Sequence, residues 1–144
     1  MLYNDVCIVE RRFIILSLKF NNNGLFKTVQ FADPQDGPDT DLRTLKLMNN
    51  ILDMEKPDLV VLTGDNIDGK CKSKGDVIKA ITNIVEPMES RGIPWATVFG
   101  NHDGEHGVMN KVDMMKVYMS FRYSLSEAGF KTSDRIGNYN IKLW

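Results

Sequence analysis

Side chains able to bind metal ions or transfer protons follow three apolar segments of this 144-residue sequence. They are Asp33 and Gln35 after the first segment, Asp65 after the second, and Asn101 and His102 after the third. Carboxylate, amide and imidazole groups are costly to bury unless something pairs with them. Oxygen ligands together with imidazole suit Mn²⁺, Fe or Zn²⁺. Two such ions can clamp a phosphoryl group and activate a water molecule, so the pattern indicates metal-assisted phosphate chemistry.

The apolar segments are predicted to be strands of one sheet. Residues 58–63 (DLVVLT) are continuously apolar, as in strands buried on both faces of a parallel sheet, and residues 93–99 (IPWATVF) are similar. Residues 12–32 are expected to form an N-terminal β-hairpin around the turn sequence NNNG. A last strand is predicted at residues 138–144 (NYNIKLW).

Apolar residues at helical spacing predict three helices between these strands. Their apolar positions are Leu42, Leu45, Met48 and Leu52, with Pro57 closing the segment; Val77, Ile81, Ile84 or Val85, and Met88; and Met115, Tyr118, Phe121 and Leu125. The alternation of strand and helix predicts an α/β domain with a largely parallel sheet. Ligands of such sheets bind beyond the carboxyl ends of the strands, so we expect the polar residues to meet there.

Three motifs at these strand ends resemble those of the calcineurin-like metallophosphoesterase superfamily. They are Asp33-x-Gln35, Gly64-Asp65-x-x-Asp68-Gly69 and Gly100-Asn101-His102-Asp103. The segments EPMESRGIPWATVFGNHDGE and SFRYSLSEAGF are most similar to the branch with yeast Dcr2-type phosphatases and the plant purple acid phosphatase 28/29 group. The resemblance covers nearly all of residues 12–144. It implies a single partial domain over residues 1–144, the N-terminal half of a β-sandwich flanked by helices.

The resemblance also implies a set of metal ligands for two divalent ions (Mn, Fe or Zn). Asp33 would bind the first ion, Asp65 would bridge both, and Asn101 would bind the second through its amide oxygen. Gln35 stands where the family pattern has a histidine, and its amide oxygen can still act as a ligand.

The catalytic residues implied by the resemblance are His102 and Asp68. His102 would act near the leaving-group oxygen, as an acid or as a stabiliser of the transition state. Asp68 would orient it, because a carboxylate on one imidazole nitrogen fixes the tautomer and raises the pKa. True purple enzymes often have Tyr at that position, so we expect no purple chromophore here.

The implied function is hydrolysis of a phosphate ester, on a protein or small molecule, by metal-bound hydroxide at a dinuclear centre. The family's later metal histidines, including its G-H-x-H motif, have no counterpart after Asp103, and His106 is expected to be an exposed loop residue. We therefore expect a truncated chain whose C-terminal half of the fold is missing or supplied by a partner. The alternative is a catalytically inactive binding or regulatory module.

Composition argues against several other classes. With 18 basic and 19 acidic residues the net charge is -1, which favours neither nucleic acid nor an anionic membrane as partner. We see no signal peptide and no apolar run long enough to cross a bilayer, so a cytoplasmic location is expected. Cys7 and Cys71 lie far apart without a CxxC partner, which argues against a disulfide framework or a zinc knuckle. The methionines of residues 109–119 are expected in the core, and residues 70–74 in a solvated loop.

Overall fold

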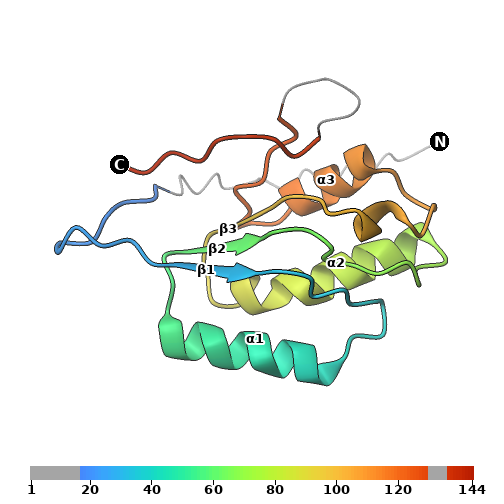
Figure 1. Ribbon diagram of the computed structural model, residues 1–144, viewed down its shortest axis with the longest axis horizontal. Helices are drawn as coiled ribbons and strands as arrows, with labels where there is room; N and C mark the ends of the chain where they lie inside the picture. The colour runs from blue at the N-terminus through green and yellow to red at the C-terminus, as the bar shows by residue number, and fades with distance from the viewer. Residues whose placement is uncertain (1–16, 130–135) are drawn as a thin grey trace, which may run out of the picture.

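A computed structural model describes residues 17–129 and 136–144 of the chain, and Figure 1 shows its ribbon. The elements in chain order are β1 (Thr28–Phe31), α1 (Leu42–Glu55), β2 (Leu59–Leu62), α2 (Lys74–Glu89), β3 (Trp95–Thr97), the short 3₁₀ helix η1 (His102–Gly104) and α3 (Lys111–Met119). Strands alternate with helices, so the predicted α/β class is confirmed.

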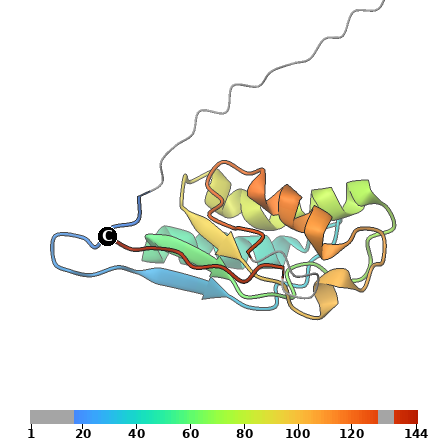
Figure 2. The same ribbon diagram turned by 90° about the horizontal axis from the view of Figure 1, so that it is seen from above.

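The three strands form one parallel sheet in the order β1-β2-β3. Val29 of β1 lies opposite Val60 of β2, and Val60 lies opposite Trp95 of β3. Because the strands run in the same direction, their carboxyl ends face the same edge of the sheet, where the following loops gather (Figure 1). Figure 2 shows α2 and α3 side by side on one side of the strands. The predicted parallel arrangement of the central strands is therefore confirmed.

One hydrophobic cluster connects the sheet with all three helices. Its fully buried members include Val60, Leu62, Val77, Ala80, Ile81, Ile84, Val85, Met88, Trp95, Met114 and Tyr118. Each large apolar side chain buried in this way stabilises the fold by about 1.5–3 kcal/mol relative to exposure. Met114 and Met115 lie in this cluster, as expected for the Met-rich segment.

Side-chain caps fix where α1 and α2 begin. The Asp41 carboxylate accepts a hydrogen bond from the Arg43 N–H over 2.8 Å at the start of α1. At the start of α2, Ser73 Oγ accepts from the Asp76 N–H while the Asp76 carboxylate accepts from the Ser73 N–H, which is a capping box. Both helix starts follow loops that leave the carboxyl edge of the sheet, so the caps also anchor those loops.

Helix α3 ends at Met119, so the prediction of a helix continuing to Leu125 was wrong. Instead, the chain turns and runs beside β3. Trp95 N–H donates to the Tyr123 carbonyl over 3.0 Å, and Leu125 N–H donates to the Trp95 carbonyl over 2.7 Å. The ring of Phe121 packs against Trp95, with centroids 6.0 Å apart. Pairing with the edge of the sheet therefore prevails over the helical spacing of the apolar residues.

The chain ends also differ from the prediction. The turn at residues 21–24 is present, but β1 pairs with β2, and residues 17–20 form no strand. They contact the end of the chain instead, where Trp144 N–H donates to the Leu18 carbonyl over 3.0 Å. The rest of the first predicted hairpin strand lies outside the described residues. Residues 138–144 form no strand either. Separate contacts hold this segment, such as the hydrogen bond from the Tyr139 hydroxyl to the Thr97 carbonyl.

No helix within residues 17–129 and 136–144 is long and apolar enough to cross a membrane. Cys71 is a buried free thiol, and burial raises the pKa of that thiol. Cys7 lies outside the described residues.

Candidate functional site

The loops that follow β1, β2 and β3 are joined by hydrogen bonds at the carboxyl edge of the sheet. Asp33 N–H donates to the Gly64 carbonyl over 3.3 Å, and Gln35 N–H donates to the Asp65 carbonyl over 3.0 Å. The Asp65 carboxylate in turn accepts a hydrogen bond from the His102 N–H, with Oδ1 and N 2.7 Å apart. The three motifs of the sequence therefore meet at one place.

Three of the candidate metal ligands have a left-handed backbone. The φ angles are 52° at Asp33, 41° at Gln35 and 51° at Asp65. This region is unfavourable for residues other than glycine, although Asp adopts it more readily than most. Such strain costs on the order of 1–3 kcal/mol per residue and gathers at functional sites. Its concentration on these three residues makes the edge of the sheet the leading candidate site.

Two glycines allow the loops after β2 and β3 to approach closely. A Cβ atom built at Gly100 would overlap the carboxylate of Asp65, and one built at Gly64 would lie 2.5 Å from the Gly100 nitrogen. Gly64 also has a φ of 102°, which other residues rarely adopt. Both glycines are therefore required by the contact that positions Asp65.

Asp103, the last residue of the third motif, connects the loops after β2 and β3 through hydrogen bonds in the protein interior. Its side chain is fully buried. Oδ2 accepts hydrogen bonds from the N–H groups of Asp65 (2.9 Å) and Gly100 (2.7 Å), while Oδ1 accepts from those of Asn66 (2.8 Å) and Ile67 (3.1 Å). A buried carboxylate with four amide donors is well satisfied. The sequence placed Asp103 in the motif without indicating this role.

Asp36 has a similar role in the loop after β1, and sequence reasoning missed it. Its side chain is 6% exposed. The carboxylate accepts hydrogen bonds from the N–H groups of Gly37 (2.8 Å) and Asp41 (3.1 Å). It therefore closes the loop that carries Gln35. The only signal in the sequence was the density of Asp, Pro and Gly in residues 33–41.

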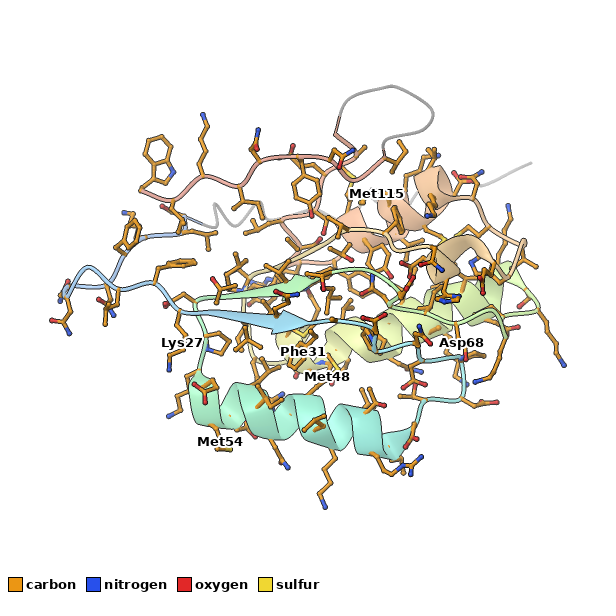
Figure 3. The ribbon with its side chains drawn as sticks, in the orientation of Figure 1. Lys27, Phe31, Met48, Met54, Asp68 and Met115 are labelled. Carbon is orange, nitrogen blue, oxygen red and sulfur yellow. The ribbon has the colours of Figure 1, made fainter. Side chains whose placement is uncertain are left out.

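His102 and Asp68 lie in the same cavity but bind different partners. His102 Nδ1 lies 2.8 Å from Glu105 Oε2, whereas Asp68 Oδ2 lies 2.5 Å from Lys70 Nζ. Figure 3 shows Asp68 beyond the carboxyl end of the strands, at the opposite end of the sheet from Lys27. The orientation of His102 by Asp68, implied by the family resemblance, is thus not the arrangement in this structure.

The pKa of the His102 imidazole is raised above its ordinary value. The main cause is the hydrogen bond to Glu105, to which the negative charges of Glu105, Asp65 and Asp33 add, while desolvation acts in the opposite direction. A raised pKa keeps more of the imidazole protonated at neutral pH.

The cavity beside His102 has a volume of about 310 Å³. Its walls are formed by Gln35, Asp68, Gly69, Lys70, His102 and Glu105. A larger groove of about 890 Å³ adjoins it, and the two share Gln35, Gly69 and Lys70. Of the four candidate metal ligands, Gln35 lines both the cavity and the groove.

The candidate metal ligands differ in exposure. Asp33, Gln35 and Asn101 are exposed, and Asp65 is 9% exposed. Over the described ranges, no three His, Cys, Asp or Glu side chains are arranged to hold a metal ion. Two of the four candidate ligands, Gln35 and Asn101, are amides, and the other two are carboxylates. Oxygen ligands of this kind, with the His102 imidazole nearby, are the type that hard and borderline divalent cations prefer. These residues fit part of a metal site, because their donor atoms are suitable and because they all lie at the carboxyl edge of the sheet.

His106 is a half-buried loop residue rather than an exposed one. Its Nδ1 accepts a hydrogen bond from the Val108 N–H over 3.1 Å. This contact gives it a local role in the loop that leads to α3.

Residues 26–141 match the family model described as calcineurin-like phosphoesterase. The chain belongs to this family. Among its relatives, "Probable inactive purple acid phosphatase 14" of Arabidopsis thaliana is 35% identical, over 88% of this chain and 36% of its own length. "Probable inactive purple acid phosphatase 28" of the same plant is 29% identical, over 99% and 41%. "Phosphatase DCR2" of Saccharomyces cerevisiae is 32% identical, over 88% and 25%.

These relatives confirm the similarity to the Dcr2-type and purple acid phosphatase-like branch of the calcineurin-like phosphoesterases. The chain spans less than half the length of each of these three relatives. No solved structure matches it significantly.

Proposed function

We propose that the chain carries part of the active site of a metal-dependent phosphoesterase, which hydrolyses phosphorylated proteins or small molecules. The observation that supports this most is the meeting of the three motif loops at the edge of the sheet, with Asp33, Gln35 and Asp65 in strained, left-handed conformations. Backbone strain of this kind gathers at active sites and ligand-binding sites.

In this proposal Asp33, Gln35, Asp65 and Asn101 are ligands of two divalent ions. When bound, the ions would supply Lewis-acid stabilisation of the phosphoryl oxygens and an activated water. His102 stands at the wall of the cavity. There it would donate a proton to the leaving-group oxygen, which would otherwise depart as an unstable alkoxide.

The second candidate function is a binding or regulatory module without catalysis. Two observations favour it: two of the relatives are named as probable inactive enzymes, and the described residues lack a convergent trio of His, Cys, Asp or Glu. Under this alternative, or if a partner chain completes the site, further metal ligands come from outside the described residues.

Calorimetry with Mn²⁺ and hydrolysis of an aryl phosphate separate the two functions. The enzyme proposal predicts binding of two Mn²⁺ per chain and hydrolysis that Asp65→Asn and His102→Ala each reduce at least 100-fold. Asp53→Asn is the matched control, because the Asp53 side chain is 65% exposed and lines neither the cavity nor the groove, and this variant should retain full activity. Absence of both Mn²⁺ binding and hydrolysis, or hydrolysis that is unchanged in Asp65→Asn and His102→Ala, would contradict the proposal. Size measurement in solution would show whether a partner chain is involved.

A further inference from the structure

The contact between His102 and Glu105 follows from the local geometry of η1. Glu105 N–H donates to the His102 carbonyl over 3.0 Å and closes the 3₁₀ turn. In a 3₁₀ turn the side chains of residues i and i+3 eclipse each other. Glu105 Oε2 accordingly lies 2.8 Å from His102 Nδ1.

The turn that holds this pair is anchored to the interior of the protein. The buried carboxylate of Asp103, between the two residues, accepts four backbone N–H groups of neighbouring loops. His102 N–H is itself bonded to Asp65 Oδ1 over 2.7 Å. The backbone of the turn is thus fixed at two points, although the side chains of His102 and Glu105 are 41% and 53% exposed.

The alternative partner, Asp68, is engaged on another wall of the same cavity. Its Oδ2 lies 2.5 Å from Lys70 Nζ, and its Oδ1 accepts the Lys70 N–H over 2.9 Å. Glu105 is near both His102 and the loop that carries Asp68: its Oε2 lies 2.8 Å from His102 Nδ1, and a Cβ atom built at Gly69 would be 3.6 Å from Glu105 Cβ. The cavity therefore has two separate ion pairs, His102 with Glu105 and Asp68 with Lys70.

We propose that Glu105 is the positioning residue of His102, in place of Asp68. This inference rests on the proposed function, in which His102 acts on the leaving group. A carboxylate that accepts a hydrogen bond from Nδ1–H fixes the ring orientation and the tautomer, and it leaves Nε2 available to the substrate. Asp68 forms an ion pair with Lys70, whose side chain is 82% exposed, and contributes a wall of the cavity. At this level of exposure the pair adds little to stability, so its effect lies in orientation.

The tautomer of His102 can be measured by ¹⁵N NMR on the full chain without metal. The chain has only two histidines, so His106→Gln assigns both rings and His106 serves as an internal reference. At about pH 9, well above the ordinary imidazole pKa of ~6.5, we expect the single ring proton of His102 on Nδ1. In Glu105→Ala it should move to Nε2, the form that a free imidazole side chain favours. Glu105→Gln should keep it on Nδ1, because the amide oxygen still accepts, and Asp68→Asn should leave it unchanged.

A proton that stays on Nδ1 in Glu105→Ala, or moves to Nε2 in Asp68→Asn, would overturn the inference. If the amide spectrum of Glu105→Ala shows an altered fold, Glu105→Asp decides by the same criterion, because its carboxylate is one methylene too short for the contact. The measurement requires neither metal nor substrate. A wild-type chain that neither binds Mn²⁺ nor hydrolyses the ester would therefore contradict the proposed function alone and leave this result standing.

Discussion

Asp103 Oδ2 accepts a hydrogen bond from the backbone N–H of Asp65 over 2.9 Å, which ties the loop after β3 to the loop after β2. Asp65 is a candidate metal ligand, whereas Asp103 is fully buried and contacts backbone amides. The position of the ligand is therefore set by a carboxylate that has no direct part in the proposed chemistry. The two aspartates of the motifs have different roles because one faces the interior and the other faces the edge of the sheet.

The first prediction concerns the buried carboxylate. In Asp103→Asn the amide NH₂ group would replace an oxygen that accepts two N–H donors, those of Asp65 and Gly100. Each buried group left unsatisfied costs about 1–3 kcal/mol. We expect the free energy of unfolding to fall by about 3 kcal/mol, which is within the range for a broken buried network. Urea denaturation followed by circular dichroism measures this change.

The matched control is Asp113→Asn in the first turn of α3. Asp113 Oδ1 lies 2.6 Å from Lys116 Nζ, but the pair is exposed, and such pairs contribute about 0.2–1 kcal/mol. An equal decrease in the free energy of unfolding of the two variants would show that the four hydrogen bonds accepted by Asp103 do not stabilise the fold.

The sequence predicted the strand-end motifs because their signals are local. Apolar runs such as residues 58–63 are buried strands, and the polar residues that follow them must lie at the carboxyl edge of a parallel sheet. The partner of His102 was not predicted, because the family pattern indicated Asp68, and only the 3₁₀ turn brings Glu105 to the imidazole. The end of α3 was missed for a related reason: the pairing of residues 123–125 with β3 is a long-range contact that helical spacing cannot reveal.

The second prediction concerns the close approach of Gly100 to Asp65. In Gly100→Ala the new methyl group would overlap the Asp65 carboxylate and displace it. Overpacking of this kind costs about 1–3 kcal/mol. We expect a lower melting temperature together with loss of Mn²⁺ binding, as measured by calorimetry.

Gly104→Ala, in the same loop, is the control for this substitution. A methyl group there would have Lys111 Cε as its nearest neighbour at 3.4 Å, the end of a flexible side chain. Its Mn²⁺ affinity should equal that of the wild type. If Gly100→Ala also binds Mn²⁺ normally, the position of the Asp65 carboxylate is irrelevant to the metal.

The third prediction concerns stability at alkaline pH. The Tyr139 hydroxyl donates to the Thr97 carbonyl over 2.6 Å, and burial raises the pKa of this phenol above 10. The neutral phenol is thus favoured in the folded state, so its stabilisation is complete below the unfolded pKa of ~10 and is lost as pH rises through the folded value. Tyr139→Phe should cost about 1 kcal/mol at pH 7 and show a weaker loss of stability above pH ~10.

Urea denaturation at a series of pH values from neutral to alkaline measures this dependence as the difference between the variant and the wild type. Tyr123→Phe is the control. The hydrogen bond of Tyr123 to Glu89 Oε1, over 2.9 Å, comes from its backbone N–H and is kept when the phenol hydroxyl is removed. Parallel curves for the wild type and Tyr139→Phe would mean that the phenol of Tyr139 does not contribute to the pH dependence.

The fourth prediction concerns stabilisation by metal. An ion that binds only the folded state adds RT ln(1 + [L]/Kd), which is about 2.7 kcal/mol at a hundredfold excess over Kd. We expect Mn²⁺ to raise the melting temperature of the wild type and to have little effect on Asp65→Asn, because Asp65 is the carboxylate at the junction of the three loops. Asp53→Asn, whose exposed side chain lines neither the cavity nor the groove, should respond as the wild type does. A shift of equal size in Asp65→Asn would mean that Mn²⁺ binds elsewhere on the chain.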